Sequence, residues 1–108
     1  MKQREIKFRW IAPQTGRWEY INIEDITAEI DFGGTLGQYT GLKDKNEKEI
    51  YEGDIVKNKH GYLSKIELVE FFEGGFSPFA NDLDEVFCWR KEDCEIIGNI
   101  YENPNLLK

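Results

Sequence analysis

Apolar and charged residues alternate near the start of the sequence. Apolar residues take every second position: Ile6, Phe8 and Trp10. Charged residues take the positions between them: Glu5, Lys7 and Arg9. Successive side chains of a strand point to opposite faces, so this alternation is typical of a half-buried β-strand. The sequence predicts a strand over residues 5 to 11, with its cations on the outer face.

A turn and a second strand follow. Residues 13 to 16 read Pro-Gln-Thr-Gly, which combines the fixed φ of Pro with the free φ of Gly. Residues 17 to 23 are rich in aromatic and β-branched side chains, and the whole segment predicts a β-hairpin. Residues 24 to 30 fit either a short helical turn or an irregular edge. Further strands are predicted over residues 38 to 42, 49 to 57, 64 to 72, 86 to 89 and 95 to 101.

Glycine, proline and polar clusters mark the breaks between these strands. Polar turns are predicted at 43 to 48, 58 to 61 and 90 to 93, and a longer loop at 76 to 85. Gly53 precedes Asp54 and a buried strand, which indicates a sharp backbone corner because Gly tolerates positive φ. Gly74 and Gly75 are expected to end the strand before them. Pro104 is expected to open a short helical turn that Leu106 and Leu107 dock.

The chain has 108 residues, which favours one domain, 1–108, around one core. We expect a mainly β fold: a small, partly open β-barrel-like domain with an N-terminal β-hairpin and little helix. The sequence has no run of about 20 apolar residues and no signal-peptide pattern near its start. We therefore expect a cytoplasmic protein with no membrane partner.

Charge is distributed unevenly. The formal net charge is −7, which makes nucleic acid an unlikely partner, because Lys and Arg supply most of the affinity for phosphates. Residues 1 to 17 nevertheless carry an excess of cations, and Lys7, Arg9 and Arg17 could form a basic stripe across the hairpin. This stripe would either bind single-stranded nucleic acid or pair with acids of the same chain or of a second copy. A second candidate surface is the acidic run that contains Asp82, Asp84 and Glu85.

No catalytic, cofactor or metal pattern emerges from the sequence. His60 is the only histidine and is expected in a solvated turn, and the acidic segments do not fit a calcium-binding loop. The spacing of Cys88 and Cys94 fits neither a redox pair nor a zinc site, so reduced thiols are expected, although a cross-hairpin disulfide stays open. The aromatics of the hairpin are expected to fill the core, and base stacking is the alternative.

Two long motifs carry a family resemblance. Residues 38 to 46 read QYTGLKDKN and residues 48 to 56 read KEIYEGDIV. Together with REIKFR at 4 to 9 and IGNIYENP at 97 to 104, they resemble the YopX-like family over nearly the whole chain. The resemblance implies a small, mainly β protein encoded by temperate phages or prophages, and it implies no established activity, cofactor or catalytic residues. Glu47 departs from the pattern, which has Gly after Asn and so favours a tight primed turn.

The sequence leads to a non-enzymatic accessory protein that acts through a protein partner from the host or the phage. A second copy of the chain is left open as that partner. The alternative is a nucleic-acid-associated factor that uses the basic N-terminal hairpin, and an uncharacterised hydrolase ranks third.

Overall fold

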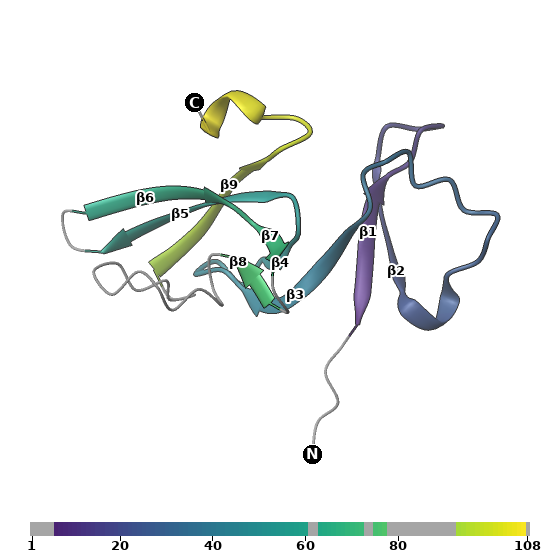
Figure 1. Ribbon diagram of the computed structural model, residues 1–108, viewed down its shortest axis with the longest axis horizontal. Coiled ribbons are helices and arrows are strands. Elements are labelled where there is room, and N and C mark those ends of the chain that lie inside the picture. The colour runs from purple at the N-terminus through teal and green to yellow at the C-terminus, as the bar shows by residue number, and fades with distance from the viewer. Residues whose placement is uncertain (1–5, 61–62, 73–74, 78–92, 108) are drawn as a thin grey trace, which may run out of the picture.

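The computed structural model describes residues 6 to 60, 63 to 72, 75 to 77 and 93 to 107. These residues form a mainly β protein, as predicted (Figure 1). The strands are β1 (Lys7–Ile11), β2 (Trp18–Asn22), β3 (Gly37–Lys43), β4 (Glu49–Tyr51), β5 (Asp54–His60), β6 (Leu63–Leu68), β7 (Glu70–Phe72), β8 (Gly75–Ser77) and β9 (Cys94–Asn99). The described residues also include two short 3₁₀ segments, η1 (Ile23–Asp25) and η3 (Pro104–Leu107).

The N-terminal hairpin is confirmed and belongs to an antiparallel sheet with the order β2-β1-β3-β4. Arg9 lies opposite Tyr20, and Trp10 lies opposite Glu19. Gly16 closes the turn with a φ of 72°, a conformation that Gly adopts at little cost. In Figure 1, β3 runs from the hairpin toward β4 and so joins the two sides of the molecule.

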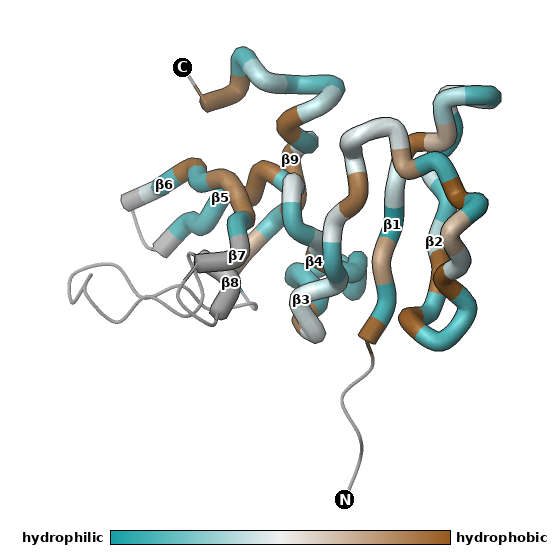
Figure 2. The backbone as a smooth tube through the Cα atoms, turned by 45° about the vertical axis from the view of Figure 1, so that its right-hand side comes forward, coloured by the Kyte–Doolittle hydropathy of each residue, from teal (hydrophilic) through white to brown (hydrophobic). Residues whose placement is uncertain are grey.

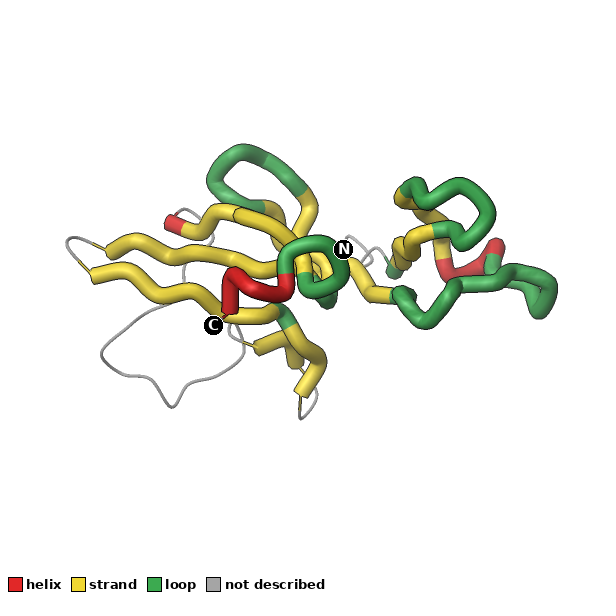
Figure 3. Tube along the Cα trace, turned by 90° about the horizontal axis from the view of Figure 1, so that it is seen from above, coloured by secondary structure: helices red, strands yellow, loops and turns green. Residues whose placement is uncertain are grey.

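The longer strands form a second antiparallel sheet with the order β6-β5-β9, and β7 pairs with β8 in a short ladder. Among the described strands no sheet closes on itself, so the β-barrel-like expectation holds only in its open form. Seen from above, the hairpin and the loop that follows it lie to one side of the longer strands (Figure 3).

The aliphatic core lies at the junction of β4, β5 and β9. It comprises Ile50, Val56, Val69 and Cys94, with Leu42 and Ile96 packed against it. The hairpin side has an aromatic contact of its own, because the rings of Trp10 and Phe32 meet edge to face with 5.1 Å between centroids. Apolar residues accordingly occur in both halves of the molecule (Figure 2).

Two glycine positions show how local conformation limits side chains. Gly53 has a φ of 96°, which confirms the predicted corner between β4 and β5. Gly98 lies under the C-terminal turn, where a Cβ atom would come within 2.8 Å of Leu106 Cδ1. The η3 segment begins at Pro104, as expected, and Leu106 docks on β9.

Four predictions about segment boundaries are wrong. The strand predicted over residues 49 to 57 is divided by a turn at residues 52 and 53 into β4 and β5. Residues 58 to 60 continue β5 instead of turning, because β5 is the central strand and pairs with both β6 and β9. The strand predicted over residues 64 to 72 is interrupted at Val69 and forms β6 and β7. Gly75 begins β8 instead of ending a strand, and β8 occupies the start of the predicted loop. The strand predicted at 86 to 89 lies outside the described residues.

Candidate functional site

An ion pair joins the hairpin to the rest of the molecule. Arg9 Nη2 donates to Asp54 Oδ1 at 2.5 Å, and the other carboxylate oxygen of Asp54 accepts from the backbone N–H of Tyr51 at 2.8 Å. The corner at Gly53 places Asp54 so that its carboxylate reaches both partners. The side chains of Arg9 and Asp54 are 10% and 3% exposed, so the pair is desolvated.

Aromatic rings enclose the guanidinium of Arg9. Its Cζ lies 4.1 Å from the ring centroid of Trp18 and 4.8 Å from that of Tyr51. The ring faces attract the cation, and the fixed fork of the guanidinium lets it bond Asp54 while it stacks. Arg9 Nε is buried and has no hydrogen-bond partner in the described part of the chain.

A second ion pair lies beside the first. Lys7 Nζ donates to Glu49 Oε2 at 2.5 Å, and the Tyr51 hydroxyl donates to Glu49 Oε1 at 3.0 Å. Lys7 also lies 5.0 Å from the ring centroid of Tyr39. Both cations of β1 therefore pair with acids of the β4–β5 segment, each against an aromatic ring.

The surroundings shift the pKa values of these groups in different directions. Burial raises the pKa of Asp54, although the charge of Arg9 and the hydrogen bonds from Tyr51 and Arg9 oppose the shift. Burial alone would also raise the pKa of Glu49, but hydrogen bonds from Lys7 and Tyr51 and the charges of Lys7 and Lys43 outweigh it and lower the pKa. Burial, followed by the hydrogen bond to Glu49, raises the pKa of the Tyr51 hydroxyl well above its ordinary value.

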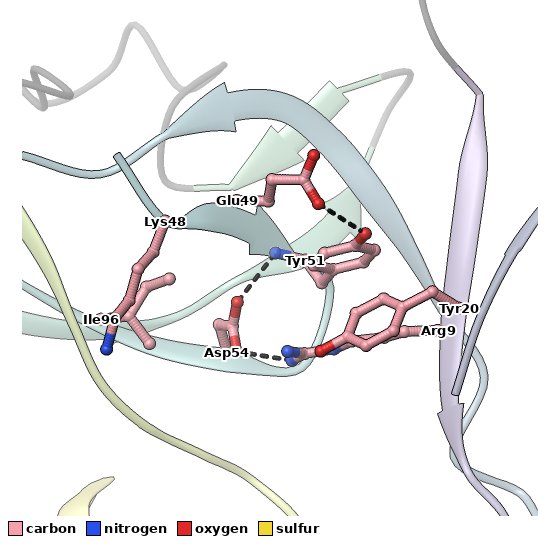
Figure 4. A pocket seen from close by; sticks show the side chains of 7 residues that line it. All are labelled: Arg9, Tyr20, Lys48, Glu49, Tyr51, Asp54 and Ile96. Atoms are coloured by element: carbon pink, nitrogen blue, oxygen red, sulfur yellow. Dashed lines mark hydrogen bonds and ion pairs between the residues drawn. The ribbon is translucent and has the colours of Figure 1, made fainter. Parts of the chain in front are cut away.

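A pocket of about 400 Å³ opens beside this network. Its lining residues are Arg9, Tyr20, Lys48, Glu49, Tyr51, Asp54 and Ile96. Figure 4 shows Tyr20 in front of Arg9 at one side of the pocket and Lys48 with Ile96 at the other. The Tyr20 ring lies 5.7 Å from that of Tyr51, yet Tyr20 is 57% exposed, so it forms part of the rim. The pocket thus presents an aromatic rim above charged groups that are paired with one another.

The residues predicted to form an interaction site do not form a continuous exposed basic stripe in the described part of the chain. The outward orientation expected for Arg9 is wrong, because Trp18, Tyr51 and Asp54 enclose it. Lys7 is partly buried against Glu49, so same-chain pairing accounts for both cations of β1. Arg17 is exposed in the hairpin turn. Asp82, Asp84 and Glu85 lie outside the described residues, and contact of any of these six residues with a partner stays a prediction.

Sequence reasoning did not single out the acids that hold the network together. The sequence places Asp54 only at the corner after Gly53, and the signal it offers is that an Asp at such a corner can accept a hydrogen bond from a nearby backbone N–H. Asp44 is similarly buried: one carboxylate oxygen accepts from Asn46 N and Lys48 N, and the other from Ile96 N at 3.1 Å. It therefore ties the turn before β4 to β9.

Two candidate residues from the sequence, Cys94 and His60, lie in the described part of the chain. Cys94 is a buried free thiol, and burial together with the nearby acids Asp44, Asp54 and Glu95 raises its pKa to about 12. That shift suppresses the thiolate, which is the reactive form. Cys88 lies outside the described residues, and His60 is the last residue of β5.

Two further features are absent from the described residues. No group of three or more His, Cys, Asp or Glu side chains is arranged to hold a metal ion within these residues. No helix of the same residues is long and apolar enough to cross a membrane.

Comparison with known proteins places the whole chain in one family. No curated protein matches significantly. Among solved structures, the crystal structure of protein EF1440 from Enterococcus faecalis is similar, with 26% identity and a TM-score of 0.60. The match covers 95% of this chain and 98% of that one. A family model described as YopX protein matches residues 1–108, the full length of the sequence. The chain therefore belongs to the YopX family.

Proposed function

We propose that this protein is a non-enzymatic accessory protein of a phage or prophage that acts by binding another protein. Membership of the YopX family supports the phage type of the protein. The family match assigns no reaction, so the mode of action rests on the geometry of the candidate site. Consistent with an accessory role inside the infected cell, we place the protein in the bacterial cytoplasm.

The observation that carries this proposal is the contrast between the interior of the pocket and its rim. Inside, Arg9 pairs with Asp54 and Glu49 accepts from both Lys7 and Tyr51, so these groups stabilise the fold. A general base needs an accessible group with a pKa near neutrality. The pKa of Glu49 is lowered, and Asp54, whose pKa is raised, is 3% exposed and bonded to Arg9 and Tyr51. At the rim, the large side chain of Tyr20 is 57% exposed. Exposed tyrosines of this kind are enriched where proteins bind one another.

The nucleic-acid alternative receives less support from the same residues. It required Lys7 and Arg9 to present their charges on the outer face of β1, but both are neutralised by acids of the same chain. Arg17 is the member of the proposed stripe that stays exposed. With a net charge of −7, the protein as a whole repels phosphates.

A pull-down followed by reconstitution tests the proposal. The tagged protein is incubated with a lysate of the bacterium that carries the phage or prophage, and captured proteins are identified by mass spectrometry. The expected result is one protein that, once purified, binds with fixed stoichiometry in calorimetry. If no purified candidate binds saturably, while single-stranded DNA binds at low salt and is released by added salt, the nucleic-acid alternative replaces the proposal.

A further inference from the structure

No described strand pairs with the outer edge of β2. In the sheet order β2-β1-β3-β4, β2 is the terminal strand and pairs only with β1 in the described part of the chain. Backbone bonds join Ile23 N to Ile6 O and Ala12 N to Arg17 O at its two ends, which fixes the alternation of inward and outward groups. By that alternation, the N–H and C=O groups of Trp18, Tyr20 and Asn22 point away from β1.

Open edges are places where another chain can pair, and proteins normally protect them with Lys, Pro, a bulge or a covering segment. Here β2 has neither Lys nor Pro, and its register with β1 runs without a bulge. The loop after β2 does not take up the outward backbone groups: within the described residues, its backbone bonds are made elsewhere. As far as the described residues go, the edge is therefore left available for strand pairing.

The surroundings of the edge are acidic. Residues 18 to 42 contain five acids and no Lys, Arg or His. The acids are Glu19, Glu24, Asp25, Glu29 and Asp31, all exposed. None of them forms an ion pair with another described residue. Arg17, exposed directly before Trp18, is the nearest opposing charge, so β2 and the loop that follows it still carry a net negative charge.

The two faces of β2 differ. Tyr20 lies opposite Arg9 and its side chain reaches the pocket, whereas Glu19 lies opposite Trp10. Phe32 packs on Trp10, so the Phe32 part of the loop of residues 23 to 36, here called the acidic loop, lies on the same face as Glu19. A strand added to this edge would place alternate side chains beside Tyr20 on one face and near the acids on the other.

We infer that β2 is the docking edge for an extended, basic segment of a partner protein. The partner adds a strand to β2, its apolar side chains pack near Tyr20, and its Lys or Arg side chains face Glu19 and the acidic loop. Backbone hydrogen bonds supply the affinity and the alternating side chains supply the specificity, as in other cases of β-strand addition. This inference rests on the proposed function and names the surface and the partner chemistry.

The first test uses a capped heptapeptide of alternating Val and Lys as the probe and NMR of the full-length protein as the readout. We expect its addition to shift the amide signals of Trp18, Tyr20 and Asn22 and to slow their hydrogen exchange by roughly tenfold or more. The matched peptide with Glu in place of Lys should do neither. Changes spread evenly over the acidic surface, or the same response to both peptides, would overturn the inference.

Two variants separate the edge from its charges. Tyr20→Pro removes an outward N–H that β1 does not use, which edge strands tolerate, and it should abolish the response to the peptide. A Glu24→Lys, Asp25→Lys variant should weaken binding by roughly tenfold, since it reverses two charges beside the edge. The matched control is Glu47→Lys, Glu70→Lys, which reverses two exposed charges outside residues 18 to 42. Equal weakening by both charge pairs would contradict a local docking site.

The partner from the pull-down distinguishes failure of this inference from failure of the proposed function. If a purified partner binds the parent and Tyr20→Pro equally well, the docking edge is wrong while the protein-binding function stands. If no partner binds at all, the proposed function itself fails. If the three β2 amides shift with protein concentration in the absence of peptide, a second copy occupies the edge, and the basic partner is excluded.

Discussion

The turn before β4 allows a quantitative test, because Glu47 has a left-handed backbone with a φ of 64°. Asp44 N donates to Lys48 O at 2.8 Å, and Glu47 N donates to Asp44 O at 3.0 Å. This pattern is that of a three-residue hairpin loop whose last residue adopts the left-handed conformation. Gly suits that position best, so Glu47→Gly should stabilise the protein.

The expected gain follows from two opposing terms. The left-handed conformation costs a residue with a Cβ atom about 1 to 2 kcal/mol, which Gly avoids. Gly in turn loses about 0.5 to 1 kcal/mol more backbone entropy on folding. The Glu47 side chain is exposed, so little packing is lost on its removal. The net stabilisation should be about 0.5 to 1 kcal/mol, which corresponds to a rise in Tm of roughly 3 to 6 °C for a domain of this size.

Thermal and urea unfolding of three proteins test this reasoning. Glu47→Gly should melt above the parent with an unchanged urea m-value. Glu47→Ala is the matched control, because it removes the same side chain but keeps the Cβ atom, and its Tm should stay close to that of the parent. If Gly and Ala have the same effect, or if Gly lowers the Tm, backbone strain at Glu47 does not limit stability.

The remaining predictions concern the polar network and the corner beside it. Arg9→Leu leaves the buried carboxylate of Asp54 unpaired and should cost about 3 to 5 kcal/mol in urea unfolding; the loss should shrink at low pH, where Asp54 is protonated, and a pH-independent loss would contradict this. Glu49→Gln should reduce stability at neutral pH only. Because the pKa of Glu49 is lowered in the folded protein, its carboxylate stabilises the fold at pH values above its ordinary pKa of 4.5, and this contribution disappears as acid protonates Glu49. Equal stability of parent and variant at pH 7 would show that the pair with Lys7 is not stabilising. Gly53→Val should cost about 1 to 3 kcal/mol, because β-branched residues tolerate positive φ poorly, and an unchanged Tm would refute a strained corner.

The sequence was sufficient to predict the fold class and most strands. The signals used were local: alternation over β1, β-branched and aromatic residues over β2, and polar turns around β4. At these places the local preference of the chain agrees with the final fold. The corner at Gly53 and the turn at Pro104 were also predicted, because Gly and Pro restrict the backbone wherever they occur. These are the places where one residue type decides the conformation.

Tertiary context overrode local preference elsewhere. Asn58 favours turns, yet it lies in the central strand β5, fully buried, and its amide atoms have no partner among the described residues. Pairing of β5 on both sides decided its conformation. Arg9 lies on the strand face that the alternation predicts. Alternation shows only that a strand has two different faces, and it does not show that one of them is exposed to solvent. Both faces of β1 are covered, one by Phe32 and its loop and the other by the β4–β5 corner.

The joint between the hairpin and the rest of the molecule is therefore polar and aromatic, while the aliphatic core lies elsewhere. Ile50, Val56 and Val69 pack at the junction of β4, β5 and β9. The hairpin is held by the ion pairs of Arg9 and Lys7 and by the Tyr51 ring, which contacts Arg9 and Tyr20. Removing a buried partner from such a joint is costly, because the remaining charge stays desolvated. The position of β2 relative to the body depends on this joint, since β2 is attached through β1. An edge strand held in this way presents a fixed register to a partner, which lowers the entropy cost of binding.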